Sequence, residues 1–341
     1  MHRFQIVIVG CGQMANAWVN YAIARPDAAI VALVDIRRES AQAMADKHGL
    51  SCGIYTDLAS ALQETTANLV FDITIPAVHR EVVLTALSHS CDVLGEKPMA
   101  PSMEEAKLMV DAAVRSGRMY AVMQNRRFLQ PIRAYKHILE SGTIGKLGFL
   151  TAQFFVGPRF GGFRDAMDSP LLLDMAIHTF DQARFLIGAD PVSVYCHEFN
   201  PAGSWYQGRA AAACIFEFGD GIVFTFNGSW AAQGVPTSWD AEWRAIGSHG
   251  TAIWDGNHAP YAEVVVPETD AAKSFIAPTK RTEAEFQWGD RQERHDGCLD
   301  EMFAALIEGR DAETVCTDNI KSMAMVYGAL ESARIGQKVQ L

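Results

Sequence analysis

A lysine stands at a predicted strand-to-helix junction in the first third of the sequence. Lys97 lies between Glu96 and Pro98, after a short apolar run at residues 91–94 that predicts a buried strand. Residues 102–116 predict a helix, because Ser102 and Glu105 have the spacing of a capping box. Ligands of an open parallel sheet bind at the carboxyl ends of its strands. Most lysines at strand ends are only solvated, but a cation there can stabilise negative charge on a substrate oxygen.

A glycine-rich turn follows the first predicted strand and suits a phosphate ligand. The run Gly10-Cys11-Gly12-Gln13-Met14-Ala15 has the G-x-G-x-x-A spacing of a dinucleotide-binding turn. Gly10 permits the tight turn, Gly12 lets backbone amides approach a pyrophosphate, and the helix that starts beside Gln13 and Met14 favours the negative charge. The motif predicts a nicotinamide dinucleotide cofactor.

Asp35 bears on which nicotinamide dinucleotide binds. It stands about 20 residues beyond the turn, where an acid holds the ribose 2′-hydroxyl. This favours NAD, because a carboxylate repels the 2′-phosphate of NADP. Arg37 and Arg38 follow at once and would suit that phosphate if Asp35 turned away, or they cap and solvate the next helix. The prediction is NAD, with Arg37 among its contacts and NADP as the alternative.

Asp174 and His178 lie four residues apart on a predicted helix that Pro170 opens and Gly188 ends. That spacing puts both on one face, which Asp181 shares. A histidine beside a carboxylate suits general acid/base chemistry, since its ring titrates near neutral pH and the carboxylate fixes its tautomer. The structural alternative is a pair that only satisfies its own hydrogen bonds. We expect no metal site, because no His or Cys cluster at ligand spacing accompanies the pair.

The chain changes its pattern of secondary structure after about residue 124. Residues 1–124 alternate short apolar strands with helices, which predicts a doubly wound parallel sheet, a Rossmann domain. Residues 125–341 favour antiparallel pairs, 211–218 with 222–230 and 243–247 with 251–254, and end in helices within 296–336. The expected fold class is α/β, with the Rossmann domain followed by an α+β domain that has an open, mainly antiparallel sheet.

Composition argues against several classes of protein. The chain has 341 residues, enough for two domains, and its net charge of −11 argues against nucleic acid or an anionic membrane as a partner. Its seven cysteines include no Cys-x-x-Cys pair and suit a reducing compartment. No apolar run approaches the roughly 20 residues that a membrane span needs. We therefore expect a cytoplasmic protein.

Three separated motifs resemble those of the Gfo/Idh/MocA family of sugar and polyol dehydrogenases, which includes the inositol dehydrogenases. The likeness covers nearly the whole chain and rests on Gly10-x-Gly12-x-x-Ala15, Glu96-Lys97-Pro98 and Asp174-x-x-x-His178-x-x-Asp181. The resemblance implies that Lys97 and His178 handle the reacting hydroxyl and that Asp174 helps to position the sugar.

The resemblance also implies further contacts and an assembly. Pro76 and His79 belong to a turn similar to the one that lies beneath the nicotinamide ribose in the family, although Ala77 replaces the usual Asn. We expect cofactor contacts at these two residues and at Glu96 and Lys97. A homodimer or homotetramer is expected as well. Weaker candidates for contacts with the substrate are Arg127, Arg164, Asp181 and Trp239.

The expected function is hydride transfer between a nicotinamide cofactor and a secondary alcohol or ketone of a sugar, polyol or related carbohydrate. Residues 1–124 would bind the cofactor, and residues 125–341 would bind the substrate and form the oligomer. Two alternatives stay open. One is an NAD-dependent redox glycosidase, and the other is a non-catalytic NAD(H)-binding sensor.

Overall fold

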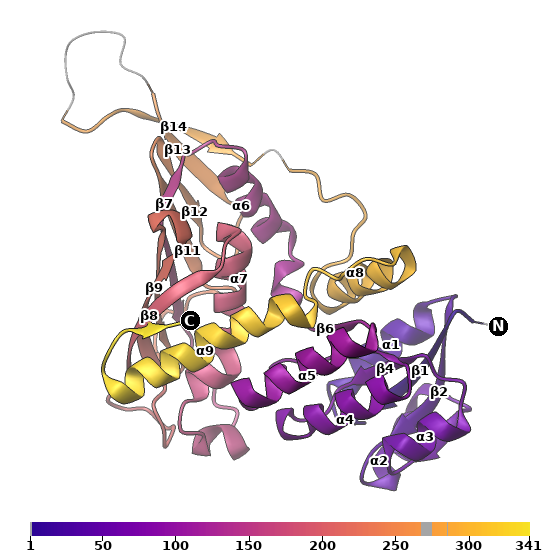
Figure 1. Ribbon diagram of the computed structural model, residues 1–341. Helices are drawn as coiled ribbons and strands as arrows, with labels where there is room; N and C mark the ends of the chain where they lie inside the picture. The colour runs from indigo at the N-terminus through magenta and orange to yellow at the C-terminus, as the bar shows by residue number, and fades with distance from the viewer. Residues whose placement is uncertain (1, 267–274, 285) are drawn as a thin grey trace. The chain divides into compact units, whose positions relative to one another are not determined.

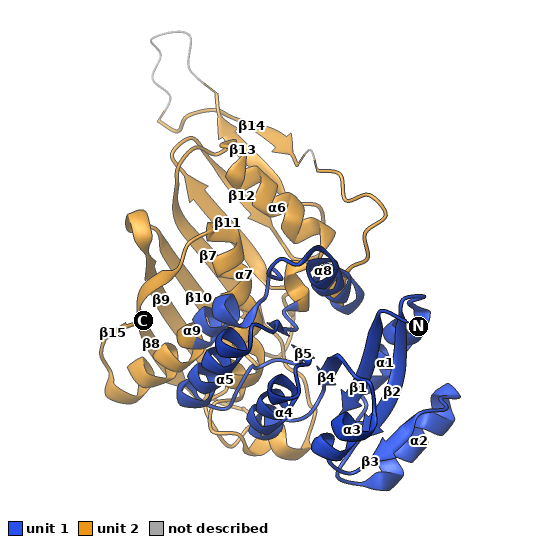
Figure 2. Ribbon diagram, turned by 45° about the vertical axis from the view of Figure 1, so that its right-hand side comes forward, with its two compact units in different colours: residues 1–124, 295–323 blue, residues 125–294, 324–341 orange. Residues whose placement is uncertain are grey.

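The computed structural model describes residues 2–266, 275–284 and 286–341 (Figure 1). The chain divides into two compact units (Figure 2). Unit 1 comprises Met1–Gln124 and His295–Met323, and unit 2 comprises Asn125–Arg294 and Ala324–Leu341.

Unit 1 is built on a six-stranded parallel sheet with the strand order β3-β2-β1-β4-β5-β6. This is the order of a doubly wound dinucleotide-binding fold, so the predicted Rossmann sheet is confirmed. Its strands are short, and most of their residues are buried, because helices cover both faces of such a sheet. The strands are β1 (Phe4–Val9), β2 (Ala28–Val34), β3 (Gly53–Tyr55), β4 (Leu69–Asp72), β5 (Asp92–Gly95) and β6 (Tyr120–Val122).

The helices of this sheet begin and end at the residues that local chemistry favours. The Ser102 hydroxyl accepts the Glu105 N–H at 3.2 Å, as the predicted capping box requires. Gly49 and Gly117 take the left-handed conformation that ends a helix. The helices are α1 (Ala15–Ala24), α2 (Arg38–His48), α3 (Leu58–Glu64), α4 (Pro76–Ser88) and α5 (Met103–Ser116).

A segment from near the end of the chain completes unit 1. Helix α8 (Arg294–Glu308) carries Phe303, which is fully buried and packs edge-on against Phe4 with ring centroids 4.9 Å apart. The Tyr21 hydroxyl donates to Asp300 at 2.6 Å. All of residues 125–341 are predicted to form the second domain, whereas in the structure residues 295–323 belong to the unit of the Rossmann sheet. Helix α9 (Cys316–Ile335) follows and crosses the boundary between the units.

Unit 2 is built on a nine-stranded sheet with the order β14-β13-β12-β11-β7-β10-β9-β8-β15. Neighbouring strands are antiparallel except for β10 and β7, which are parallel, so the sheet is mixed and mainly antiparallel, as predicted. Both predicted hairpins are present. The strands are β7 (Leu147–Phe155), β8 (Pro191–Phe199), β9 (Ala211–Phe218), β10 (Val223–Ser229), β11 (Glu242–Gly247), β12 (Gly250–Trp254), β13 (Tyr261–Val265), β14 (Thr279–Glu283) and β15 (Val339–Gln340).

Helices cover one face of this sheet. Helices α6 (Gln130–Glu140) and α7 (Ile177–Ile187) lie over it (Figure 2), and Phe180 of α7 packs edge-on against Phe216 at 4.9 Å. Along β8 and β9, buried residues alternate with exposed ones such as Tyr195 and Ile215, as expected when one face of a sheet is solvated. None of the described helices is long and apolar enough to cross a membrane.

Candidate functional site

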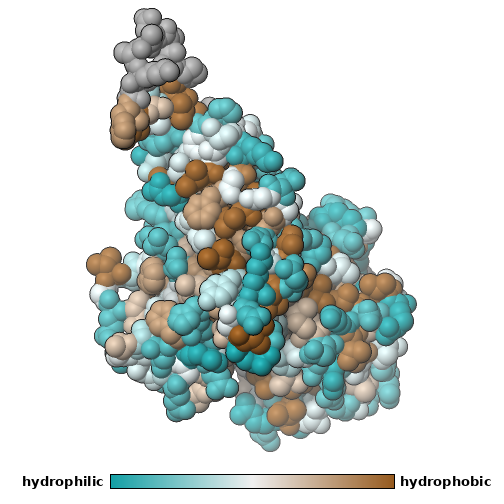
Figure 3. Space-filling view, turned by 60° about the vertical axis from the view of Figure 1, so that its left-hand side comes forward, coloured by the Kyte–Doolittle hydropathy of each residue, from teal (hydrophilic) through white to brown (hydrophobic). Residues whose placement is uncertain are grey.

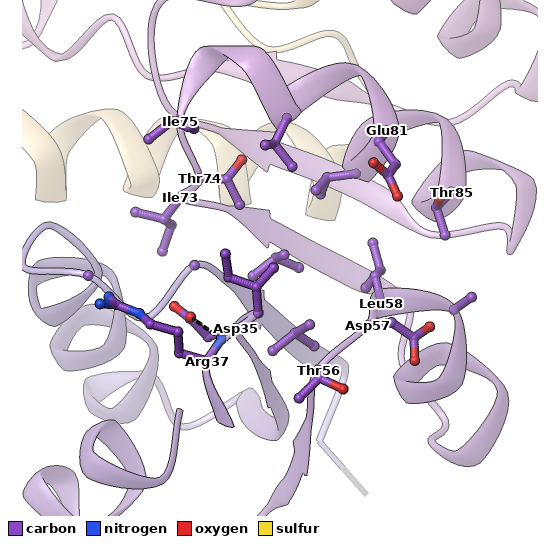
Figure 4. Close-up of a pocket in the computed structure, with 18 residues that line it drawn as sticks. Asp35, Arg37, Thr56, Asp57, Leu58, Ile73, Thr74, Ile75, Glu81 and Thr85 are labelled. Carbon is purple, nitrogen blue, oxygen red and sulfur yellow. Dashed lines mark hydrogen bonds between the residues drawn. The ribbon is translucent and has the colours of Figure 1, made fainter. Parts of the chain in front are cut away.

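A pocket of about 460 Å³ lies in unit 1, where β1, β2 and β4 end. In Figure 4, Asp35 and Arg37 lie on one side of it, and Ile73, Thr74 and Ile75 lie on the other. This is the carboxyl edge of the parallel sheet, where open α/β sheets bind their ligands. The lining also includes Gly10, Gly12, Thr56, Asp57, Leu58, Glu81 and Thr85.

The glycine turn at this pocket leaves room for a phosphate group. Gly10 has a φ of +90°, and a β-carbon there would lie 2.6 Å from the carbonyl oxygen of Ile73, so only glycine fits without a shift. A β-carbon on Gly12 would meet no atom within 4 Å, which leaves open space beside the start of α1. Met14, just before α1, is 47% exposed. These residues, with Gln13 between them, fit the pyrophosphate of a dinucleotide.

Asp35 is held in place by two backbone hydrogen bonds. Its Oδ2 accepts the Cys11 N–H at 3.0 Å, and its Oδ1 accepts the Arg37 N–H at 2.9 Å. The carboxylate is therefore fixed at the pocket wall, next to the glycine turn. Burial, with the charge of Asp35 as a second cause, raises the pKa of the Cys11 thiol to about 12. Cys11 is thus a neutral thiol at physiological pH and not a nucleophile.

His79 supports the pocket from behind. It is 1% exposed, and its Nδ1 lies 2.7 Å from Oδ2 of the fully buried Asp72. The Thr74 hydroxyl donates to the other oxygen of Asp72 at 2.6 Å. Together these bonds fix the turn that forms one wall of the pocket. Pro76, another predicted cofactor residue, is the first residue of α4 in the same turn.

Glu96 joins the Lys97 segment to the helix of the glycine turn. Its Oε1 accepts the indole N–H of Trp18 at 2.9 Å, and its Oε2 accepts the Lys97 N–H at 3.2 Å. Glu96 and Trp18 are buried, whereas Lys97 is half-buried. The backbone of Lys97 is therefore anchored directly after β5.

In unit 2, Asp174 lies in a π-helical turn and not in the continuous α-helix that the sequence predicts. Leu171–Ala176 forms the π-helix and runs into α7, where His178 stands in the first turn. Short π segments widen a helix by one residue and are frequent at functional sites. The side chain of His178 is 7% exposed. Arg164 donates from Nε to Asp174 Oδ2 at 2.6 Å, so two predicted site residues form an ion pair.

Arg127 and Asp181, both predicted to contact the substrate, pair with each other. Two nitrogens of the Arg127 guanidinium donate to the two oxygens of Asp181 at 2.6 and 2.7 Å. Both side chains are buried. This bidentate pair fixes the start of unit 2 against α7 and accounts for the burial of both charges.

The predicted substrate residue Trp239 is 44% exposed, and its contacts involve residues that the sequence analysis did not select. Its carbonyl oxygen accepts a hydrogen bond from Arg126. Burial lowers the pKa of Arg126 to about 10, although Asp240 acts in the opposite direction. The Trp239 ring lies 6.3 Å from that of Phe160. The sequence signal for Phe160 was the run Phe160-Gly161-Gly162-Phe163. Aromatic residues in a glycine-rich loop belong to no α-helix or strand that would bury them.

Comparison with known protein families matches both halves of the chain. Residues 4–124 match the oxidoreductase family with an NAD-binding Rossmann fold, Gfo/Idh/MocA. Residues 132–253 match the C-terminal domain of the same family.

Individual relatives and solved structures agree with that assignment. The D-glucoside 3-dehydrogenase of Escherichia coli (strain K12) is 30% identical over 207 residues, which cover 59% of each chain. The D-apiose dehydrogenase of Rhizobium rhizogenes is 27% identical over 354 residues, which cover 100% of this chain and 98% of the relative. A crystal structure of an Agrobacterium radiobacter oxidoreductase, in complex with NAD+, L-tartaric acid and magnesium, has the same fold. It gives a TM-score of 0.85 at 24% identity and covers 99% of this chain and 98% of its own.

The two family matches together span more than half of the chain and include both the glycine turn and the π-helical segment. The resemblance found in the sequence is therefore confirmed, and the protein belongs to the Gfo/Idh/MocA family of oxidoreductases.

Proposed function

We propose that this protein is an NAD-dependent dehydrogenase or reductase acting on a secondary alcohol or ketone of a sugar, polyol or related carbohydrate. The observation that carries the proposal is the pocket in unit 1, where the fixed carboxylate of Asp35 stands beside the open face of Gly12. The names of the relatives, D-glucoside 3-dehydrogenase and D-apiose dehydrogenase, support a carbohydrate as the substrate.

The arrangement of Asp35 supports NAD over NADP. Turning this carboxylate away from the pocket would break its bonds to the N–H groups of Cys11 and Arg37. Its negative charge therefore stays at the pocket wall, where it would repel the 2′-phosphate of NADP. The same carboxylate is suited to accept hydrogen bonds from the ribose hydroxyls of NAD.

We assign the reacting groups as follows. When bound, the nicotinamide supplies the hydride acceptor or donor. Lys97 stabilises the substrate oxygen, and His178 takes the hydroxyl proton as the carbon loses its hydride, or returns it in the reverse direction. Asp174 orients the sugar by accepting hydrogen bonds from its hydroxyl groups. The bonds of Glu96 to Trp18 and to the Lys97 backbone support this role by restricting the Lys97 segment.

A spectrophotometric screen of sugars and polyols with NAD+ and NADP+ tests the proposal. We expect NAD+ reduction with at least one carbohydrate, and we expect Lys97→Met to lower kcat by about 100- to 1000-fold. The Kd for NADH should rise much less, because Lys97 is only one of the expected cofactor contacts. Lys107→Met, an exposed position on α5, is the matched control and should behave as wild type. Absence of turnover across the panel, or full activity of Lys97→Met, would refute the proposal. Sugar release without net NADH would instead identify the redox glycosidase.

We also propose that unit 2 forms a homo-oligomer through the open face of its sheet. Tyr195, Phe199, Ile215 and Ile246 on β8, β9 and β11 are 41–49% exposed, and Figure 3 shows apolar residues among polar ones on the side of the molecule where this sheet lies. Light scattering should find a dimer or tetramer that Ile215→Lys dissociates. Ile307→Lys, an equally exposed position on α8, should leave the mass unchanged. A monomeric wild-type protein would contradict this assignment.

A further inference from the structure

An exposed aromatic cluster adjoins the Arg164–Asp174 ion pair in unit 2. It consists of Phe160 and Phe163, from the loop after β7, and Trp239, from the loop before β11. Their side chains are 52%, 69% and 44% exposed. Large exposed apolar side chains that gather in one place usually mark a binding surface, whereas scattered ones need no explanation.

One arginine joins these rings to the carboxylate. The Arg164 guanidinium lies over the ring of Phe160 at 5.1 Å and over that of Phe163 at 4.8 Å. The same guanidinium donates to Asp174 at 2.6 Å. The third ring of the cluster, Trp239, lies 6.3 Å from Phe160. A continuous chain of contacts therefore leads from Asp174 to all three rings.

A second and independent set of contacts reaches the same turn of helix. Arg126 donates to the carbonyl oxygen of Trp239, and its other terminal nitrogen lies 3.6 Å from the sulfur of Met175, the residue after Asp174. Arg126 is itself positioned by Asp240, 3.6 Å from its guanidinium. Arg126 thus links Trp239 to the π-helical segment through contacts that do not involve Phe160 or Arg164. Both sets of contacts lie within unit 2, so the adjacency of the rings and Asp174 is a property of this unit alone.

The cluster restricts the chemistry of its ligand. A carboxylate next to aromatic rings suits a molecule with hydroxyl groups at one end and an apolar face at the other. A single sugar ring has a small apolar face, and a linear polyol has no fixed one. Three exposed aromatic side chains offer more area than one sugar ring covers, since each such side chain can bury about 150–250 Å². The excess area calls for an apolar group attached to the sugar.

We propose that Phe160, Phe163 and Trp239 form a subsite for the aglycone of a glycoside whose sugar ring is held at Asp174. The preferred substrates are then glycosides with an apolar or aromatic aglycone, and not free sugars or linear polyols. This inference rests on the proposed function in one respect, the binding of the sugar by Asp174.

The test compares matched substrates with the holoprotein in NAD+. Each of several hexoses is offered as the free sugar, the methyl glycoside and the phenyl glycoside, with the corresponding linear polyol. We expect KM to be about tenfold lower for the phenyl than for the methyl glycoside, from the area that a phenyl group buries. Trp239→Leu and Phe160→Leu should raise KM for the phenyl glycoside about tenfold and change KM for the methyl glycoside much less. Phe275→Leu removes a fully exposed ring elsewhere in unit 2 and should change neither value.

Several outcomes would overturn the subsite. They are equal KM values for methyl and phenyl glycosides, a linear polyol as the best substrate, and variants that raise both KM values alike. A change of oligomeric state in Trp239→Leu would show that a second copy of the chain covers the rings. If no carbohydrate is turned over, the proposed function fails, and calorimetric titration of phenyl glycosides into the holoprotein decides separately on the subsite. Binding that Trp239→Leu abolishes supports it, and absence of binding refutes it.

Discussion

Replacement of Asp35 by Asn should shift the cofactor preference of this protein without removing the pocket. The carboxylate has two oxygens, and each accepts one backbone N–H, from Cys11 or from Arg37. An asparagine offers only one acceptor oxygen, and its NH2 group would face the second N–H. The variant therefore loses the negative charge and leaves one backbone donor of the pocket wall without its acceptor.

The size of the effect follows from these contacts. A hydrogen bond to a charged acceptor contributes about 1.5–3 kcal/mol. Loss of one such contact to the ribose hydroxyls raises the Kd for NADH by about 10- to 100-fold. For NADPH, removal of the repulsion between the carboxylate and the 2′-phosphate acts in the opposite direction, so its Kd should change by less than about tenfold. The ratio of the two dissociation constants should thus move towards NADPH.

The assay is a fluorescence titration of wild type and Asp35→Asn with NADH and NADPH at constant ionic strength. Asp57→Asn is the matched control, because Asp57 lines the same pocket and caps α3 by accepting the Ser60 N–H. Asparagine caps helices about as well as aspartate, so this variant removes a charge but keeps the local fold. Equal weakening of both cofactors by Asp35→Asn, or the same shift in preference in Asp57→Asn, would refute the reasoning.

Three further outcomes are expected. Gly10→Ala places a β-carbon 2.6 Å from a carbonyl oxygen at a φ of +90°, and should weaken NADH binding at least about tenfold in the same titration. Asp181→Asn leaves the charge of Arg127 buried and should destabilise unit 2 by about 3–5 kcal/mol in urea unfolding, whereas Arg127→Met with Asp181→Leu recovers most of the loss. Burial raises the pKa of Glu198 from 4.5 to about 7, so its ionisation, as pH rises from about 4.5 through 7, should cost up to about 3 kcal/mol of stability. The melting temperature should therefore fall more between pH 5 and pH 8 for wild type than for Glu198→Gln. An equal fall in the two proteins would contradict this.

The elements with local signals were predictable from the sequence. Helix α2 has a glycine at its end, α5 has its capping box, and the glycine turn follows a strand with no charged residue. Strand β14 gave no such signal, because its five residues are all exposed and three of them are charged. Strand β8 was also missed, although its alternation of polar with apolar residues is a strand signal, because it begins with a proline shortly after the end of α7. Strand β14 is recognisable only through its pairing with β13.

Candidate site residues could be proposed from the sequence, but their contacts could not. The types and spacing of Asp35, Asp174 and His178 predict chemistry, because they follow a dinucleotide-binding turn or share one helix face, and these roles stay predictions. The bond between Trp18 and Glu96 joins residues 78 positions apart, and no spacing rule connects them. Likewise, the π-helical turn at Leu171–Ala176 depends on packing, since its sequence is that of an ordinary apolar helix.

The late segment that completes unit 1 has a consequence for biosynthesis. Phe4, Tyr21 and Phe71 leave the ribosome early, yet Phe303, which contacts all three rings, is made only after the whole of residues 125–294. At a synthesis rate of about 5–20 residues per second, these rings are made roughly 10 to 40 s before the helix that buries them. Unit 1 thus begins synthesis first but cannot complete its core until residues 295–323 have been made. Chaperones that shield nascent chains would have their target on this unit.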